Sequence, residues 1–137
     1  MRVKKKKSYK KKIDDYNLTD QVFLKGNSRS IFTYMKKAQA FVLSSLWEEP
    51  GIVMMESAFC NCFIIASDCK NGPREFLDNG QGGLLFLNNS KGALYKKILE
   101  FESMSNTEKK EKIIIAKKKS RKYSLFNHYK NLDKILN

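Results

Sequence analysis

The sequence contains one histidine, three cysteines and no long run of apolar residues. A helix that spans a bilayer needs about 20 consecutive apolar residues, and no stretch of this chain approaches that length. The first three residues run directly into lysines, without the apolar core of a secretory signal. We therefore expect a cytoplasmic location, either free or peripheral on the cytoplasmic face of the membrane.

The cysteines and the histidine are not spaced as a metal site. Cys60 and Cys62 are separated by a single residue, which is closer than a usual zinc-binding pair. With Cys69 they make an odd number, which favours reduced thiols that fill space in the interior. His128 favours a surface or packing role. The sequence predicts no metal site.

The chain has 137 residues, enough for one domain but not for two. Its formal charge is +13, from 27 basic and 14 acidic residues, and lysines gather at 4–12 and 109–119. Such clusters suit nucleic acid or an anionic membrane surface, or they simply form solvated helix faces. Only Tyr9 and Tyr16 lie near the first cluster, so nucleic acid is the less favoured partner.

Short apolar segments alternate with helical ones, and this alternation predicts an α/β fold with a parallel sheet. The expected strands are 22–24, 40–43, 63–67 and 84–86. The expected helices are 3–16, 30–38, 52–61, 72–77, 90–103, 107–123 and 126–136. The chain divides accordingly into a basic helix with its lead-in at 1–20, an α/β core at 21–87 and C-terminal helices at 88–137.

Glu48 and Glu56 flank the turn Pro50-Gly51 and the apolar run that follows it. This pattern predicts a loop that enters a helix, with Glu48 in the loop and Glu56 about a turn and a half inside. Free helix N-terminal amides suit a phosphate, and carboxylates suit the vicinal hydroxyls of a sugar or ribose. The motif therefore indicates a nucleotide-sugar pocket, with chance spacing of two glutamates as the alternative.

Segments around this motif resemble the donor-binding half of a retaining glycosyltransferase of GT-B fold. The family is the large group 1 (GT4-like) family, whose signature is Glu, seven residues, Glu. The similar segments are, in chain order, 21–26, 40–58, 63–69, 71–77, 82–86 and 123–126. The resemblance covers roughly residues 12–136 and implies a Rossmann-like parallel sheet. It also implies a truncated C-terminal nucleotide-sugar-binding domain over 1–137, since whole enzymes of this family have two Rossmann-like domains.

The resemblance also implies which strands are present. In such a domain the strand order is 3-2-1-4-5-6, and the four expected strands match the third to the sixth. Without the first two strands, 22–24 loses its neighbour and 40–43 exposes an edge. We expect a three-stranded core within 40–86, with 22–24 held loosely beside it or separated by a gap.

The resemblance assigns roles to the two glutamates of the signature. Glu48 would contact the hydroxyls of the donor sugar and is the candidate catalytic residue, and Glu56 would hold the ribose. Glu49 is an alternative sugar contact, because the family usually has glycine there.

Backbone groups complete the implied site. The amides expected to meet the sugar and the diphosphate are those of Gly51, Ile52 and Val53. Phenylalanine is common in the family at position 50, and Pro50 supplies no donor amide of its own there. Gly26 and Asn27, at the end of the first expected strand, are either candidates for contact with the base or an ordinary turn.

The resemblance implies the donor-binding part of an enzyme that moves a hexosyl-type group from a nucleotide diphosphate sugar to a glycan or lipid-linked acceptor. No cofactor and no metal are implied. The cationic pair that neutralises the departing diphosphate, and the acceptor domain, would lie upstream of Met1, so activity of this chain alone is not expected. Two alternatives stay open. One is an inactive remnant, or a subunit of a split enzyme that works with a separate N-terminal-domain polypeptide. The other is a basic module that binds nucleic acid or an anionic membrane.

Overall fold

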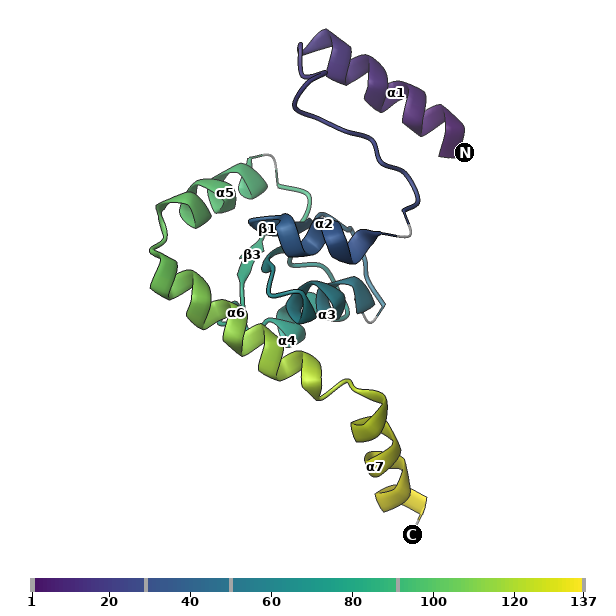
Figure 1. The fold of residues 1–137 in the computed structure, drawn as a ribbon, viewed down its shortest axis with the longest axis vertical. Helices are drawn as coiled ribbons and strands as arrows, with labels where there is room; N and C mark the ends of the chain where they lie inside the picture. The colour runs from purple at the N-terminus through teal and green to yellow at the C-terminus, as the bar shows by residue number, and fades with distance from the viewer. Residues whose placement is uncertain (1, 29, 50, 91, 137) are drawn as a thin grey trace. The chain divides into compact units, whose positions relative to one another are not determined.

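The computed structural model describes residues 2–28, 30–49, 51–90 and 92–136. The chain divides into two compact units, residues 1–31 and 32–137, which are described separately. The first unit begins with α1, Arg2–Asp15, the basic helix that the sequence predicts (Figure 1). An irregular segment follows it.

The predicted strand at 22–24 is wrong. This segment has no regular structure, and Phe23 is 64% exposed. The amide of Val22 donates to the carbonyl of Leu18 at 2.9 Å, so it closes a local turn after α1. A strand forms where its backbone groups find a partner strand, and no described strand pairs with this segment.

The second unit contains three parallel strands in the order β1-β2-β3. They are β1, Ala40–Leu43; β2, Phe63–Ser67; and β3, Leu84–Phe86, with the bounds that the sequence predicts. Ala40 lies opposite Phe63, and Ile65 lies opposite Leu84. All five residues of β2 are buried, as in the central strand of a parallel sheet with both faces covered. The expected three-stranded core is confirmed.

The predicted helices are also present, with ends that differ by a few residues. They are α2, Ile31–Lys37; α3, Ile52–Phe59; α4, Pro73–Phe76; α5, Ala93–Ser103; α6, Asn106–Arg121; and α7, Leu125–Leu136. α6 starts at a capping box, in which the Ser105 hydroxyl accepts from the Glu108 amide and the Glu108 carboxylate accepts from the Ser105 amide. No described helix has both the length and the apolar character that crossing a membrane requires.

Alternate residues of β2 supply the two halves of the core. Ile64 and Ala66 pack with residues of α3, α4 and α6. Phe63 and Ile65 face the opposite side, where the ring of Phe63 lies 4.8 Å from that of Phe101 in α5. This period of two is what a pleated strand imposes, and it places α3 on one face and α5 on the other.

The Gly82-Gly83 pair before β3 allows close approach of backbones. A Cβ at Gly83 would lie 2.5 Å from the carbonyl oxygen of Ile64 in β2. A Cβ at Gly82 would lie 3.1 Å from the amide nitrogen of Ala116 in α6. Two absent side chains thus let β3 enter the sheet while α6 crosses directly over its start.

β1 leaves one edge of the sheet without a described partner strand. Val42, in the middle of β1, is 40% exposed. An apolar edge with unpaired backbone groups favours pairing with another chain.

We expect Val42→Lys to weaken self-association of the purified protein, because a charge on an edge strand opposes further strand pairing. Sedimentation velocity over a concentration series measures the effect. Ile114→Lys is the matched control, since Ile114 is 51% exposed on α6 and lies outside the sheet. Equal association of the parent and Val42→Lys, or an equal loss in both variants, would contradict an edge-mediated contact.

Candidate functional site

The candidate site lies in the loop between β1 and α3. This loop leaves the carboxyl end of β1, the edge at which open α/β sheets bind ligands. Glu48 lies in the loop and Glu56 lies in α3. The predicted arrangement of a loop that enters a helix between the two glutamates is confirmed.

Glu48 is half-buried and is held by its neighbours. The hydroxyl of Ser45 donates to one oxygen of its carboxylate. Its amide donates to the carbonyl of Lys70 at 3.4 Å, and Trp47 forms a parallel bridge with Lys70. The loop after β2 therefore holds the backbone around Glu48, while Ser45 holds its side chain.

Two further contacts connect this loop to the ends of the other strands. The hydroxyl of Ser67, the last residue of β2, donates to the carbonyl of Ser45 at 2.5 Å. The side-chain amide of Asn88, after β3, donates to the carbonyl of Leu46 at 3.0 Å. Sequence reasoning missed Ser45 and Asn88. The Ser-x-x-Glu spacing of Ser45 and Glu48 is a signal for a local side-chain contact, whereas nothing in the sequence indicates the contact of Asn88.

Gly51 begins α3 in a left-handed conformation, with φ 66° and ψ 42°. It is buried, and a Cβ there would lie 2.5 Å from the terminal methyl carbon of Met54. The amide of Met54 donates to the carbonyl of Gly51 at 2.9 Å. The amides of Ile52 and Val53 lie in the first turn of α3, where the helix itself offers them no carbonyl acceptor. They are therefore available to bind an anion.

Glu56 lies in the second turn of α3 and is half-buried. Among the described residues its carboxylate has no hydrogen bond or ion pair. Glu49 is exposed and borders a hollow of about 290 Å³ together with Glu75, Phe76 and Tyr123. The assignment of these carboxylates to sugar or ribose stays a prediction.

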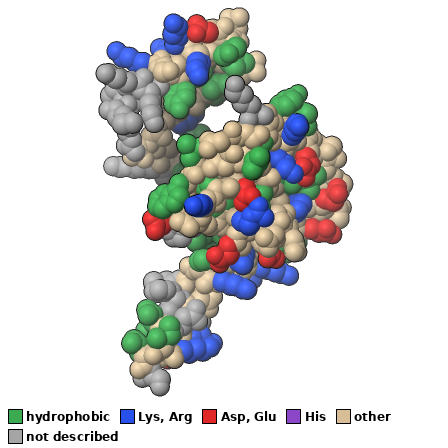
Figure 2. Space-filling view, turned by 180° about the vertical axis from the view of Figure 1, so that it is seen from behind, with side chains coloured by type: hydrophobic (Ala, Val, Ile, Leu, Met, Phe, Trp, Pro, Cys, Tyr) green, Lys and Arg blue, Asp and Glu red, His purple; other side chains and the backbone are tan. Residues whose placement is uncertain are grey.

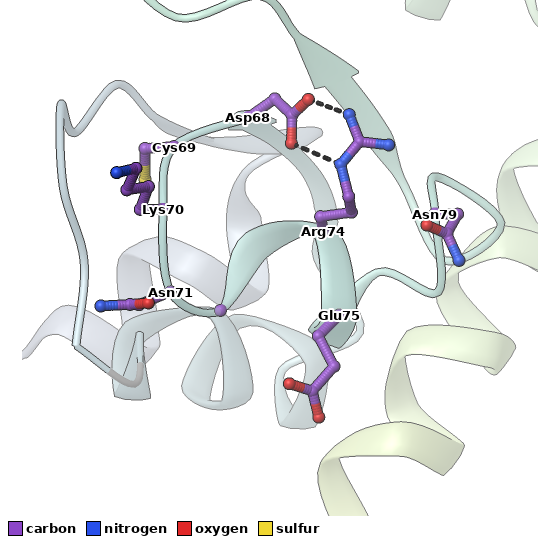
Figure 3. Close-up of a pocket in the computed structure, with 8 residues that line it drawn as sticks. Asp68, Cys69, Lys70, Asn71, Arg74, Glu75 and Asn79 are labelled. Atoms are coloured by element: carbon purple, nitrogen blue, oxygen red, sulfur yellow. Dashed lines mark hydrogen bonds and ion pairs between the residues drawn. The ribbon is translucent and has the colours of Figure 1, made fainter.

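A larger hollow of about 680 Å³ opens at the carboxyl end of β2 (Figure 3). Its lining residues are Asp68, Cys69, Lys70, Asn71, Gly72, Arg74, Glu75 and Asn79. Two hydrogen bonds join Arg74 to the carboxylate of Asp68, one of them at 3.0 Å, and Glu75 points away from this pair. The guanidinium of Arg74 is therefore already engaged with a carboxylate.

Glu75 connects α4 to the chain after α6. Its carboxylate accepts a hydrogen bond from the hydroxyl of Tyr123 at 3.3 Å, and the rings of Tyr123 and Phe76 lie 6.0 Å apart. Burial raises the pKa of the Tyr123 hydroxyl, and the negative charge of Glu75 raises it further. These contacts give Glu75 a structural role in ordering α4.

The remaining predicted site residues lie elsewhere. Gly26 and Asn27 belong to the first unit, where Gly26 has a φ of 67°, and their contact with a base stays a prediction. Pro50 lies outside the described residues. In the described part of the chain, no three His, Cys, Asp or Glu side chains gather closely enough to hold a metal ion.

The three-stranded parallel sheet and the helices around it match the fold of the C-terminal α/β domain of GT-B glycosyltransferases. Residues 2–120 match the family model described as "Glycosyl transferases group 1". The chain belongs to this family.

Curated relatives agree with the family. An uncharacterised glycosyltransferase of Methanocaldococcus jannaschii is 40% identical over 65 residues, 47% of this chain and 16% of the relative. The Campylobacter jejuni N-acetylgalactosamine-N,N'-diacetylbacillosaminyl-diphospho-undecaprenol 4-alpha-N-acetylgalactosaminyltransferase is 30% identical over 61% of this chain and 23% of the relative. The Staphylococcus aureus poly(ribitol-phosphate) alpha-N-acetylglucosaminyltransferase is 31% identical over 66% of this chain and 18% of the relative. The chain thus spans less than a quarter of the length of these relatives.

Solved structures agree with the fold. S. aureus TarM, in a complex that contains UDP, has a TM-score of 0.82 at 26% identity, over 96% of this chain and 27% of TarM. A glycosyltransferase from Rickettsia africae has a TM-score of 0.83 at 22% identity, over 93% of this chain and 35% of that one. The C-terminal domain of a group 1 glycosyl transferase from Francisella tularensis has a TM-score of 0.71 at 19% identity, over 88% of this chain and 63% of that one.

We expect Gly51→Ala to destabilise the second unit by more than the roughly 1–2 kcal/mol of a left-handed alanine, because its Cβ also displaces Met54. Urea unfolding measures the loss. Gly92→Ala is the matched control, since Gly92 precedes α5 at φ 76° with no atom within 4 Å of a built Cβ. Equal destabilisation by the two variants would show that the contact with Met54 contributes nothing.

Proposed function

We propose that this chain is the donor-binding part of a retaining glycosyltransferase. The transfer moves a hexosyl-type group from a nucleotide diphosphate sugar to a glycan or lipid-linked acceptor. The observation that carries the proposal is the placement of Glu48 and Glu56 on either side of the N-terminus of α3, at the ligand-binding edge of the sheet. The protein requires no cofactor and no metal for this role.

The proposed contacts follow from the chemistry of each group. The amides of Ile52 and Val53 and the positive end of α3 attract the diphosphate, an effect of about 0.3–1 kcal/mol for the helix dipole. The Glu56 carboxylate accepts hydrogen bonds from the ribose hydroxyls. The Glu48 carboxylate accepts them from the sugar, with Glu49 as the alternative sugar contact. Gly26 and Asn27 are the proposed contacts to the base.

The names of the relatives support this substrate class. Two are named as transferases of N-acetylhexosamine groups, one to a diphospho-undecaprenol-linked saccharide and one to poly(ribitol phosphate). A complex of S. aureus TarM contains UDP. UDP and UDP-N-acetylglucosamine are therefore the first nucleotides to test with this chain.

The catalytic step needs more than the donor contacts. The departing diphosphate requires positive charge close to it, which is electrostatic stabilisation of the charge that develops in the transition state. At the edge of the site Arg74 is paired with Asp68. We propose that the cations and the acceptor site belong to a further domain, either of a longer chain or of a separate polypeptide. Without such a domain the chain is a non-catalytic subunit that binds nucleotide.

A peripheral membrane location is a second part of the proposal. Figure 2 shows Lys and Arg side chains gathered at the edge of the second unit from which α7 leaves. The exposed basic residues of α6 and of the turn after it include Lys110, Lys118, Arg121 and Lys122. Exposed positive charge attracts an anionic lipid surface, where a lipid-linked acceptor would lie.

We expect the purified chain to bind UDP-N-acetylglucosamine with a Kd in the millimolar range or just below, which corresponds to about 4–5 kcal/mol. Glu56→Gln should weaken binding about tenfold, because it removes a charged acceptor of ribose hydrogen bonds. Titration followed by NMR chemical shifts measures both constants. Glu102→Gln is the matched control, since Glu102 is exposed on α5. Unchanged affinity in Glu56→Gln would show that Glu56 does not contact the bound nucleotide sugar.

We expect no sugar transfer by the isolated chain with any donor, because the cations for the leaving group and the acceptor site are missing from the proposed contacts. Mass spectrometry of a mixed pool of lipid-linked and glycan acceptors, after long incubation with donor, tests this. Turnover by the purified chain would show that it holds a complete catalytic site.

A further inference from the structure

Ser45 stands at the centre of the contacts that hold the Glu48 loop. Its carbonyl accepts the hydrogen bond from Ser67, and its hydroxyl donates to the carboxylate of Glu48. One residue thus connects the end of the central strand to the carboxylate that we propose as the sugar contact.

Ser67, which holds the carbonyl of Ser45, lies in a rigid part of the core. Ser67 is 0% exposed and ends the strand whose residues are all buried. Its 2.5 Å hydrogen bond fixes the position of the Ser45 carbonyl relative to the sheet. The backbone at Ser45 is therefore set by the core, although Ser45 itself lies in a loop.

The hydrogen bond from Ser45 restricts the conformation of the Glu48 side chain. Glutamate has several freely rotating bonds, and ordering such a side chain costs about 1.5–2 kcal/mol of conformational entropy. A hydrogen bond from Ser45 selects one arrangement before any ligand arrives. It occupies one carboxylate oxygen, and the other has no partner among the described residues.

The backbone of Glu48 is held from a second direction. Its amide donates to the carbonyl of Lys70, and the carbonyl of Leu46 accepts from Asn88. The backbone on both sides of Trp47 is fixed in this way, and among the described residues Ser45 supplies the hydrogen bond that holds the side chain of Glu48.

We propose that Ser45 is a positioning residue for Glu48, holding its carboxylate in the orientation that accepts hydroxyls of the donor sugar. The identity of the ligand in this inference rests on the proposed function, whereas the contact between Ser45 and Glu48 is observed in the structure. Ser45 acts through Glu48 and makes no contact with the sugar itself. Its loss weakens recognition of the sugar and leaves recognition of the nucleotide unchanged.

Four variants separate this role from general stability. Ser45→Ala removes the donor, and Ser45→Thr retains a hydroxyl and should rescue the behaviour of the parent. Ser45→Cys is of similar size with a weak donor, and it replaces the alanine variant if that variant does not fold. Ser44→Ala is the matched control, because Ser44 is exposed and has no hydrogen bond among the described residues.

The first measurement needs no ligand. NMR coupling constants and the carboxyl carbon shift of Glu48 report its side-chain conformation. We expect one dominant conformer in the parent, Ser45→Thr and Ser44→Ala, and averaging over several conformers in Ser45→Ala or Ser45→Cys. The same Glu48 signals and couplings in all variants would overturn the proposal.

The second measurement compares the affinities of the chain for UDP-N-acetylglucosamine and for UDP. We expect Ser45→Ala to lower the affinity for the sugar nucleotide about threefold to tenfold relative to UDP. An equal loss for both nucleotides would show a merely structural effect and overturn the proposal. If neither nucleotide binds to the parent, the proposed function fails, while the ligand-free measurement still decides whether Ser45 positions Glu48.

Discussion

The rest of the structure depends on the parallel pairing of β2 with β1 and β3. Parallel pairing brings the carboxyl ends of the three strands to one edge, so the loops after them meet there. The hydrogen bonds of Ser67 and Asn88 to the β1–α3 loop exist only because of this alignment. The alignment in turn requires glycine at position 83, where any side chain would collide with the carbonyl of Ile64. A packing constraint on the sheet thus becomes a geometric constraint on the candidate site.

The fold was largely predictable because its signals are local. The apolar runs at 63–67 and 84–86 lie between turn residues, the run at 40–43 ends at two serines, and the observed strands have the same ends. The position of Glu56 followed from helical periodicity after Gly51. The segment 22–24 has the same local composition as a strand, but its state depends on a neighbour that the described sheet does not provide. The hydrogen bonds that Ser67 and Lys70 make with the loop carrying Glu48 were not predictable for the same reason, since these residues reach that loop only through the tertiary fold.

Several large apolar side chains of the second unit are exposed. Val42 on β1 is 40% exposed, and Tyr129, Ile135 and Leu136 on α7 are 69%, 79% and 78% exposed. Single exposed apolar residues are common on proteins, and in this unit they also lie on α2, α3, α5 and the β1–α3 loop, among them Phe32, Ile52, Tyr95 and Trp47. The chain also spans only 26–35% of TarM and of the Rickettsia africae structure. Under the proposed function, part of this exposed apolar surface would contact the further domain or polypeptide that supplies the acceptor site.

The contacts proposed for the donor explain how the donor is bound, but they do not explain how its transfer is accelerated. Carboxylates that accept hydroxyls of ribose and sugar make the same hydrogen bonds before and during transfer, so they stabilise the ground state and the transition state alike. Acceleration requires groups whose interaction grows as charge develops on the departing diphosphate. Glu48 and Glu56 are negatively charged and cannot supply that interaction, and the nearby Arg74 is neutralised by Asp68. The amides at the start of α3 carry only partial charge. The proposed contacts are therefore suited to hold a donor in a defined orientation, and under the proposed function the positive charge for the departing diphosphate comes from a further domain at the same edge of the sheet.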